Sequence, residues 1–390
     1  MSAANPAPPG DRTTVLQVLP SLVTGGAERG CVDVAAALVR AGGRAIVASA
    51  GGQMVRELER AGAEHVTLPL DRKNPLVLRR NIDRLAELIE AEGVHLVHAR
   101  SRAPAWSAHY AARRTGRPFV TTFHAPYNFS NRAKRFYNSV MARGDRVIAV
   151  SDYVARHVAE NYGVGPDRLR TIPRGVDPAV FHPDSVTTAR LIALAKGWNL
   201  PDGAPVILLP ARLTRWKGHG VLLRAIAHLG RRDLRCLFVG SAQGRDNYRR
   251  ELEAEIDRLG LGAVAQMVDH CSDMAAAYKL STVVCHCSVE PEAFGRVIAE
   301  SLAMGRPTIA TALGAPPEVM PPGLGWLVPP DDPPALAAAL EAALALDDAG
   351  RAAYAAAAMP HVRAHFTKDL MCDRTLAVYD ELLGHAPAGA

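Results

Sequence analysis

The sequence Glu290-Pro-Glu-Ala-Phe-Gly-Arg-Val-Ile-Ala-Glu-Ser-Leu-Ala-Met-Gly-Arg-Pro307 joins a loop to a helix. The chain must turn sharply at Gly295, and the apolar run that follows predicts a helix ending at the Gly-Arg-Pro triplet. Glu292 precedes the turn and Glu300 lies inside the helix. Because unpaired N–H groups at a helix start attract anions, this stretch could hold an anionic group there and hydroxyl groups on the two carboxylates. The alternative is a pair of surface carboxylates in helix-spaced contact with Arg296.

The strand, loop and helix pattern recurs on both sides of this stretch. Short apolar segments at 13–20, 45–50, 65–68, 94–99, 119–123 and 146–150 alternate with helical stretches, and so do segments at 205–211, 236–240, 267–270, 283–288, 308–311 and 325–329. This alternation predicts the α/β class, with parallel sheets covered by helices on both faces.

The length of 390 residues and the 48% apolar content favour two domains. We expect a disordered tail at 1–12, one Rossmann-like domain at 13–185 and a second at 186–366. The remaining residues, 367–390, should hold a final helix, about Lys368–Leu383, that crosses back to the first domain.

The basic excess is uneven. The net charge is +6, and residues 1–185 hold 25 of the 45 Lys and Arg but only 17 of the 39 Asp and Glu. This favours an acidic partner for the first half, such as an anionic lipid or a phosphorylated acceptor, over nucleic acid, although solubility alone could explain it. The basic and aromatic stretch at 129–137 could lie on an anionic membrane or form an ordinary surface helix.

Neither the N-terminal residues nor the cysteines predict export. The small, Pro-rich start lacks the basic and apolar regions of a signal peptide, and no apolar run approaches the ~20 residues of a membrane span. We therefore expect a cytoplasmic protein, peripheral on the inner face of the membrane if it binds lipid. The cysteines predict buried free thiols, and Cys285-His286-Cys287 should point both sulfurs to one face of a strand. No second ligand pair is spaced for a zinc site.

Polar residues follow several predicted strands. In the first half they are the Gly25-Gly26 loop, His124, which closes the strand at 119–123, and the acceptor-side candidates Arg100, Arg102 and Trp106. Open α/β folds bind ligands at this edge, so His124 is as plausible in a site as in a structural role. The Gly-Gly loop lacks the spacing of a dinucleotide fingerprint. The helix that follows it should have an apolar face that includes Val32, Ala35, Ala36 and Val39.

In the second half, one loop carries two cations. Arg212 and Lys217 follow the strand at 205–211 and are placed to neutralise a diphosphate from the same side. No Asp-x-Asp pair occurs, so a metal is not expected and these two side chains would take its place. Further loops follow the strands at Gly240 and Gly314.

The Gly-Gly loop, Arg-x4-Lys and Glu-x7-Glu, in this order on two successive parallel-sheet domains, resemble the family 4 glycosyltransferases of the GT-B fold. The resemblance covers Val15 to about Leu383. It implies two domains facing across a cleft that holds a UDP-sugar or GDP-sugar, with no cofactor. It also implies retaining transfer to a lipid-linked or saccharide acceptor, as in lipopolysaccharide or exopolysaccharide synthesis.

The family's residues carry over position by position. The resemblance implies catalytic roles for His124, Arg212, Lys217 and Glu292. It implies donor contacts from Gly25, Gly26, Arg212, Lys217, Gly240, Glu292, Ala293, Phe294, Gly295, Glu300 and Gly314. Ala315, Pro316 and Pro317 depart from the pattern, and the two prolines donate no N–H group.

No carboxylate is obviously placed as a nucleophile, which favours same-face attack with the leaving phosphate oxygen taking the acceptor's proton. Two alternatives stay open. One is a sugar-nucleotide epimerase of the same fold, and the other is a non-catalytic scaffold that binds a nucleotide sugar.

Overall fold

The computed structural model describes residues 13–23, 25–72, 74–244 and 246–384, and it divides into two compact units. Unit 1 comprises the chain up to Arg174 and again from Asp369, and unit 2 comprises Gly175–Lys368. The expected tail at 1–12 lies outside the described residues. Each unit has one sheet with all its strand pairs parallel, which confirms the predicted α/β class.

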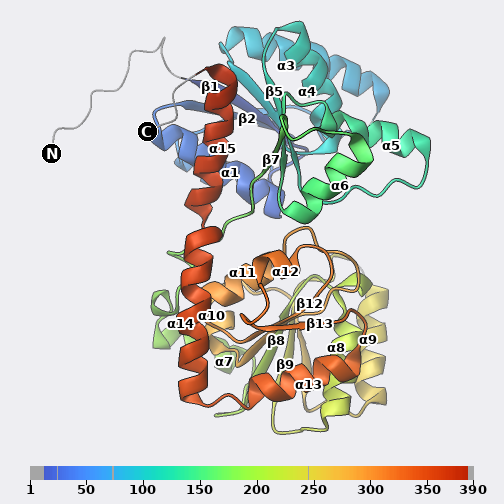
Figure 1. Ribbon diagram of the computed structural model, residues 1–390, viewed down its shortest axis with the longest axis vertical. Coiled ribbons are helices and arrows are strands. Elements are labelled where there is room, and N and C mark those ends of the chain that lie inside the picture. Colours follow the sequence, from blue (N-terminus) through green and yellow to red (C-terminus); the bar gives the residue numbers. More distant parts are fainter. Residues whose placement is uncertain (1–12, 24, 73, 245, 385–390) are drawn as a thin grey trace, which may run out of the picture. The chain divides into compact units, whose positions relative to one another are not determined.

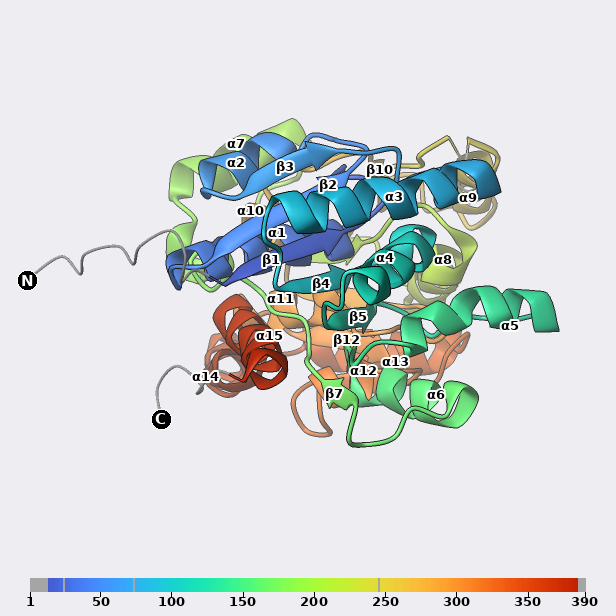
Figure 2. The ribbon, with the colours of Figure 1, turned by 90° about the horizontal axis from the view of Figure 1, so that it is seen from above.

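Unit 1 contains a seven-stranded sheet in the order β3-β2-β1-β4-β5-β6-β7. The strands are β1 (Thr14–Val18), β2 (Arg44–Ser49), β3 (Glu64–Thr67), β4 (Leu96–Ala99), β5 (Phe119–Phe123), β6 (Arg146–Ala149) and β7 (Leu169–Thr171). The helices are α1 (Gly26–Arg40), α2 (Val55–Arg60), α3 (Pro75–Ala91), α4 (Arg102–Arg114), α5 (Arg132–Asn138), the 3-10 turn η1 (Ser139–Ala142), α6 (Asp152–Tyr162) and α15 (Lys368–Leu383). Helices cover both faces of the sheet, and α3 packs beside α4 (Figures 1 and 2).

Unit 2 contains a six-stranded sheet in the order β10-β9-β8-β11-β12-β13. The strands are β8 (Val206–Pro210), β9 (Arg235–Val239), β10 (Ala265–Val268), β11 (Val283–His286), β12 (Thr308–Thr311) and β13 (Trp326–Val328). The helices are η2 (Pro183–Ser185), α7 (Thr188–Gly197), η3 (Arg215–Lys217), α8 (His219–Leu229), α9 (Asp246–Arg258), α10 (Met274–Leu280), α11 (Arg296–Ala303), α12 (Pro316–Val319), α13 (Pro333–Leu344) and α14 (Asp348–His365).

Both sheets reverse their strand order once. In unit 1 the reversal lies between β1 and β4, and in unit 2 it lies between β8 and β11. The helices that follow the two strands of such a pair leave in opposite directions, which opens a crevice at the carboxyl ends of the strands. Open α/β sheets bind their ligands in this crevice, called here the switch point.

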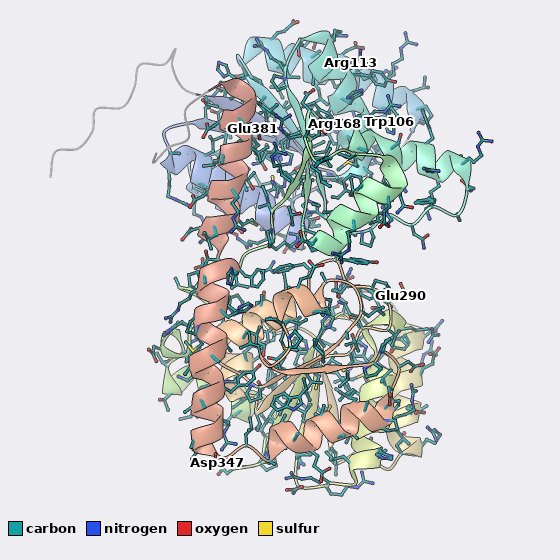
Figure 3. All side chains as sticks on the ribbon, viewed as in Figure 1. Trp106, Arg113, Arg168, Glu290, Asp347 and Glu381 are labelled. Atoms are coloured by element: carbon teal, nitrogen blue, oxygen red, sulfur yellow. The ribbon has the colours of Figure 1, made fainter. Side chains whose placement is uncertain are left out.

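Helix α15 belongs to the core of unit 1, although it comes last in the chain. Cys372 and Tyr379 lie in the apolar cluster that includes Val15 and Cys31. The Tyr379 hydroxyl is 2.7 Å from Nδ1 of the buried His98 on β4. Glu381 of α15 (Figure 3) accepts hydrogen bonds from Arg146, the first residue of β6, and from Arg170 in β7.

The apolar face predicted for α1 was partly wrong. Val32 and Ala35 are buried, as expected, but Ala36 and Val39 are only half-buried. The buried set instead includes Cys31, Val34 and Leu38. The sheet and α15 both pack on α1, so its contact surface is wider than the single stripe read from the sequence.

The unit boundaries differ from the sequence expectation of 185 and 366. Val176 forms a parallel bridge to Thr367 and packs in an apolar cluster with Phe294 and Phe366, so the segment after Arg174 already belongs to unit 2. The turn at Gly175 leaves no room for a side chain, because a Cβ there would lie 2.2 Å from the Thr367 carbonyl oxygen.

The cysteines are free thiols, and all but the half-buried Cys271 are buried. Cys285 and Cys287 lie in one core cluster while His286 points to the other face, as the alternation predicted. Within the described ranges, no group of three His, Cys, Asp or Glu could hold a metal ion. No helix among the described residues combines the length and apolar composition needed to cross a membrane.

Candidate functional site

The switch point of unit 2 brings together the loop after β8 and the loop after β11. Gly218, with φ of 73°, begins α8 directly after Lys217, and a Cβ on it would lie 1.8 Å from the Cys287 carbonyl oxygen. The two loops therefore touch because position 218 is glycine. Gly240 plays a similar part at the end of β9, where a Cβ would lie 2.0 Å from the Ala211 carbonyl oxygen.

Glu292 is the centre of this site. Its Oε2 forms a short ion pair with Lys217 Nζ, lies 3.2 Å from His286 Nε2, and accepts a 3.4 Å hydrogen bond from Ser288 Oγ. The side chains of Lys217 and Glu292 are 15% and 17% exposed, so water screens the pair only weakly. Oε1 has no hydrogen-bond partner among the described residues, which leaves one carboxylate oxygen for a ligand hydroxyl.

The environment keeps Glu292 charged. Burial alone would raise its pKa, but the hydrogen bond from His286 and the charge of Lys217 outweigh burial and lower the pKa well below its usual range. The carboxylate is therefore a permanent hydrogen-bond acceptor.

The backbone at Glu292 is held by the loop after β12. Glu292 forms an isolated parallel bridge with Gly314, and its carbonyl oxygen accepts a 2.9 Å hydrogen bond from the Ala315 N–H. That N–H is consequently bonded inside the protein and is not free to bind an anion.

The start of α11 supplies donors instead. Gly295, with φ of 93°, is its N-cap and provides no side-chain cap, so the first N–H groups of the helix have no intrahelical partner. Phe294 packs into the core next to the turn. It is 3% exposed, and its ring centroid lies 5.7 Å from that of Phe366. Ala293 is half-buried between these residues and Glu292. Glu290 lies on the same loop (Figure 3).

Both oxygens of Glu300 have protein partners. Oε2 accepts a 2.8 Å hydrogen bond from the Tyr278 hydroxyl, and Oε1 accepts a 2.9 Å hydrogen bond from Arg296. The helix-spaced contact between Arg296 and Glu300 is thus present, but Glu300 is buried and Glu292 pairs with Lys217, so the two glutamates are not the surface pair raised as the alternative from the sequence. The donor contact expected for Glu300 would use the second lone pair of an oxygen that is already bonded, or would displace Arg296.

Arg212 differs from the other charged residues of the site. It is exposed, and it forms no hydrogen bond or ion pair with any residue that the structure describes. Lys217, in contrast, is paired with Glu292 and also lies 4.0 Å from the centroid of the Trp216 ring. A diphosphate would meet an unpaired guanidinium at Arg212 and would compete with Glu292 for Lys217.

Unit 1 has a second polar cluster at its own switch point. Arg174, which follows β7, donates a 2.8 Å hydrogen bond to His124 Nδ1 and a short one to the Gly26 carbonyl oxygen at the start of α1. Gly25 precedes this turn with φ of 156°, and a Cβ on it would lie 2.3 Å from Glu28 Oε2. Arg174 was absent from the sequence prediction.

His124 is unsuited to take up a proton. Burial, together with the charges of Arg174 and Arg100, lowers its pKa well below the usual value. Because Arg174 donates to Nδ1, the neutral ring carries its proton on Nε2. His124 is therefore a neutral side chain that accepts a hydrogen bond from Arg174 and helps to fix the position of that guanidinium.

The three acceptor-side candidates have different contacts in the structure. Arg100 is buried beside the switch point, where its Nη1 donates to Gln17 Oε1 at 3.0 Å. Arg102 instead bonds Asn138 and covers the Tyr127 ring. Trp106 donates to the Tyr137 carbonyl oxygen and stacks on Phe136 at 5.2 Å (Figure 3). Of the three, Arg100 is the one whose charge helps to lower the pKa of His124.

Sequence reasoning missed His286, Ser288, Tyr278 and Arg174. The signal for His286 and Ser288 was their alternation with Cys285 and Cys287, which points them away from the core at the carboxyl end of β11. Tyr278 and Arg174 gave no comparable signal, because their partners lie far away in the sequence.

Both halves of the chain match family models of glycosyltransferases. Residues 24–180 match the family model described as Glycosyltransferase Family 4, and residues 193–358 match the model described as Glycosyl transferases group 1. The chain is 33% identical to a D-inositol 3-phosphate glycosyltransferase of Xylanimonas cellulosilytica over 78% of this chain and 76% of that protein.

Solved structures have the same fold. A glycosyltransferase from Rickettsia africae superposes with a TM-score of 0.90 at 37% identity, covering 96% of this chain and all of that one. HepE of Anabaena, crystallised with UDP and glucose, superposes with a TM-score of 0.83 at 22% identity over 95% of this chain and all of that one.

Proposed function

Because the chain belongs to the family 4 glycosyltransferases, we propose that this enzyme transfers a sugar from a nucleoside diphosphate sugar to an acceptor hydroxyl. The observation that carries the proposal is the switch point of unit 2. There Arg212 and Lys217 lie on the loop after β8, and Glu292 lies on the adjacent loop after β11 and pairs with Lys217. Among the described residues, Arg212 has no ion-pair partner and Glu292 Oε1 accepts no hydrogen bond.

The proposed roles follow from charge. Breaking the bond between the anomeric carbon and the phosphate oxygen leaves its electron pair on the diphosphate. Arg212, Lys217 and the N–H groups at the start of α11 offset that growing negative charge, and so stabilise the transition state more than the ground state. Glu292 Oε1 accepts a hydrogen bond from a hydroxyl of the transferred sugar, which fixes the orientation of the ring.

We further propose retention without a metal. The acceptor oxygen attacks the face that the diphosphate leaves, and its proton passes to the leaving phosphate oxygen, so atoms and charge balance without an added base. This scheme agrees with the low pKa of His124, which is a poor proton acceptor. Detection of a covalent glycosyl–enzyme adduct would contradict it.

For the substrates, we propose UDP-glucose or another UDP-sugar as donor, with GDP-sugars as the alternative. HepE of Anabaena was crystallised with UDP-glucose. The acceptor is a hydroxyl of a phosphorylated cyclitol or saccharide, as the names of the curated relatives suggest, or of a lipid-linked glycan in cell-surface synthesis. No observation favours the epimerase or the scaffold.

Membrane association is part of the same proposal. Helix α5 presents Arg132, Lys134 and Arg135 together with Phe136, which is 62% exposed. We expect the full chain to pellet with anionic vesicles at low salt and to be released by salt. Failure to pellet would remove the membrane from the proposal without affecting the transfer reaction.

The test of function is release of nucleoside diphosphate from a panel of UDP- and GDP-sugars, with inositol phosphates and sugar phosphates as acceptors, in the presence of chelator. Product NMR would report the anomeric configuration. We expect one donor to be used, chelator to have no effect and the anomeric configuration to be retained. Interconversion of the donor sugar without an acceptor would indicate the epimerase instead.

A further inference from the structure

Two side chains from different helices hold the carboxylate of Glu300. Tyr278 lies on α10, and its hydroxyl donates to Glu300 Oε2 at 2.8 Å. Arg296 is the first residue of α11, and its Nη2 donates to Glu300 Oε1 at 2.9 Å. The Glu300 side chain is 11% exposed, so water competes little with either donor. The direction of the carboxylate therefore depends on both contacts.

The pair between Arg296 and Glu300 uses one donor where a guanidinium can use two. Guanidinium groups commonly bind a carboxylate at two points, with parallel N–H donors to both oxygens. Arg296 Nε is buried and has no hydrogen-bond partner among the described residues. Because Nη2 already donates to Oε1, a two-point pair would use Oε2 as the acceptor for Nε. That oxygen instead accepts the hydrogen bond from Tyr278.

Tyr278 can hold Oε2 because its own ring is fixed. The residue is 0% exposed, and it packs in an apolar cluster with Val284 and Met304. Its ring also meets that of Phe181 edge-on, at 5.9 Å between centroids. Burial and the charge of Glu300 raise the pKa of the hydroxyl well above its usual value. The hydroxyl is therefore a protonated donor in a fixed position.

We propose that Tyr278 is a positioning residue, which keeps Glu300 from closing into a two-point pair with Arg296 and so keeps the carboxylate available to the donor. The proposal rests on the proposed function, in which Glu292 binds the transferred sugar and Glu300 another part of the donor. The hydroxyls of a nucleoside diphosphate are those of its ribose. Glu300 therefore accepts a hydrogen bond from a ribose hydroxyl, and the two-point pair competes with that contact.

The test measures the affinity of the full chain for UDP and for its two monodeoxy forms, each lacking one ribose hydroxyl, by calorimetry. The GDP series replaces it if wild type binds GDP more tightly. The quantity compared is the ribose ratio, defined as the affinity for the complete nucleotide divided by that for its weaker deoxy form. Because both affinities come from the same variant, a general change in diphosphate binding cancels in this ratio.

The variants are Tyr278→Phe, Arg296→Met, the double variant and Tyr354→Phe. Tyr354→Phe is the matched control, because Tyr354 is another tyrosine of unit 2 whose hydroxyl is bonded inside the protein, to the Leu324 carbonyl oxygen at 3.0 Å. It has no contact with Glu300. Arg296→Met alone keeps the proposal testable if Tyr278→Phe does not fold.

We expect a ribose ratio of about 10 or more in wild type, the value of one hydrogen bond to a charged acceptor. Tyr278→Phe should lower the ratio at least about threefold, because Nε then captures Oε2. The double variant should recover at least about half of this loss on a logarithmic scale, because no guanidinium then competes for the carboxylate. Arg296→Met and Tyr354→Phe should not lower the ratio by more than about twofold.

Several results would overturn the proposal. A wild-type ratio in Tyr278→Phe would show that the tyrosine does not position Glu300. No recovery in the double variant, or a lower ratio in Arg296→Met alone, would show that Arg296 does not compete with the donor. Equal binding of UDP and both deoxy forms to wild type would remove the ribose contact and leave the proposed function intact. If wild type bound no nucleoside diphosphate, the proposed function would fail, and this proposal with it.

Discussion

Replacing Lys217 by methionine should expose how strongly the unliganded protein depends on its pair with Glu292. The substitution leaves a carboxylate that is 17% exposed, to which His286 at 3.2 Å and Ser288 at 3.4 Å are the remaining donors among the described residues. Losing one partner of a buried pair costs about 3–5 kcal/mol. Because two donors remain, we expect about 2–3 kcal/mol of lost stability in unit 2.

The matched variants are Glu292→Gln and the double variant. Removing both charges leaves no unpaired ion, so the double variant should lose at least about 1 kcal/mol less than the sum of the single losses. The assay is urea unfolding followed by tryptophan fluorescence, to which Trp216 beside Lys217 contributes directly. Additivity within about 0.5 kcal/mol would refute the coupled pair.

The pair also predicts a pH dependence. The pKa of Glu292 is lower in the folded protein than in the unfolded chain, because His286 and Lys217 outweigh the effect of burial. Its contribution is therefore fully present above the unfolded pKa of about 4.3 and is lost as the pH falls towards the folded pKa. Glu292→Gln should remove this acid-sensitive part of the stability, and a variant with the wild-type acid slope would contradict the assignment.

Three further changes test neighbouring parts of the structure. His286→Gln, which can still donate to Glu292, should keep kcat within about fivefold of wild type. His286→Leu should lower kcat about tenfold or more with the acceptor KM unchanged. Equal kinetics in the two variants would mean that the histidine has only a structural role. Gly314→Ala should destabilise unit 2 by at least about 1–3 kcal/mol in urea unfolding. The reason is that position 314 has φ of 87°, and a Cβ there would lie 2.4 Å from the Glu292 carbonyl oxygen. An unchanged unfolding midpoint would refute this prediction. Hydrogen bonds from Arg146, opposed by desolvation, lower the pKa of Glu381 to about 2. Glu381 therefore stabilises the packing of α15 fully above pH 4.5, and this stabilisation is lost as the pH falls through about 2. Glu381→Gln should therefore speed hydrogen exchange in α15 at neutral pH and converge with wild type in acid.

The sequence predicted the strands well because their signal is local. The apolar segments at 119–123 and 308–311 match β5 and β12 residue for residue, and the final helix was predicted with its observed ends. The buried face of α1 was predicted less well from the sequence. It depends on packing against α15, whose residues lie more than 300 positions further along the chain.

The sequence could predict only those site residues that belong to a recognisable local motif. Glu292 and Lys217 were found from spacing within separate loops, and they meet because β8 and β11 are neighbours in the sheet. The contact of Arg174 with His124 joins loops 50 residues apart. No periodicity encodes such a contact, because strand order and loop conformation decide it together.

We expect the loop after β8 in unit 2 to bind the donor's diphosphate. The most direct measurement is the affinity of wild type, Arg212→Gln and Arg215→Gln for UDP-glucose by calorimetry in chelator. Arg215 is the matched control, because it lies on the same loop but is paired with Glu251. We predict about tenfold or greater weakening for Arg212→Gln and less than about twofold for Arg215→Gln. Equal affinities in all three proteins would contradict the claim.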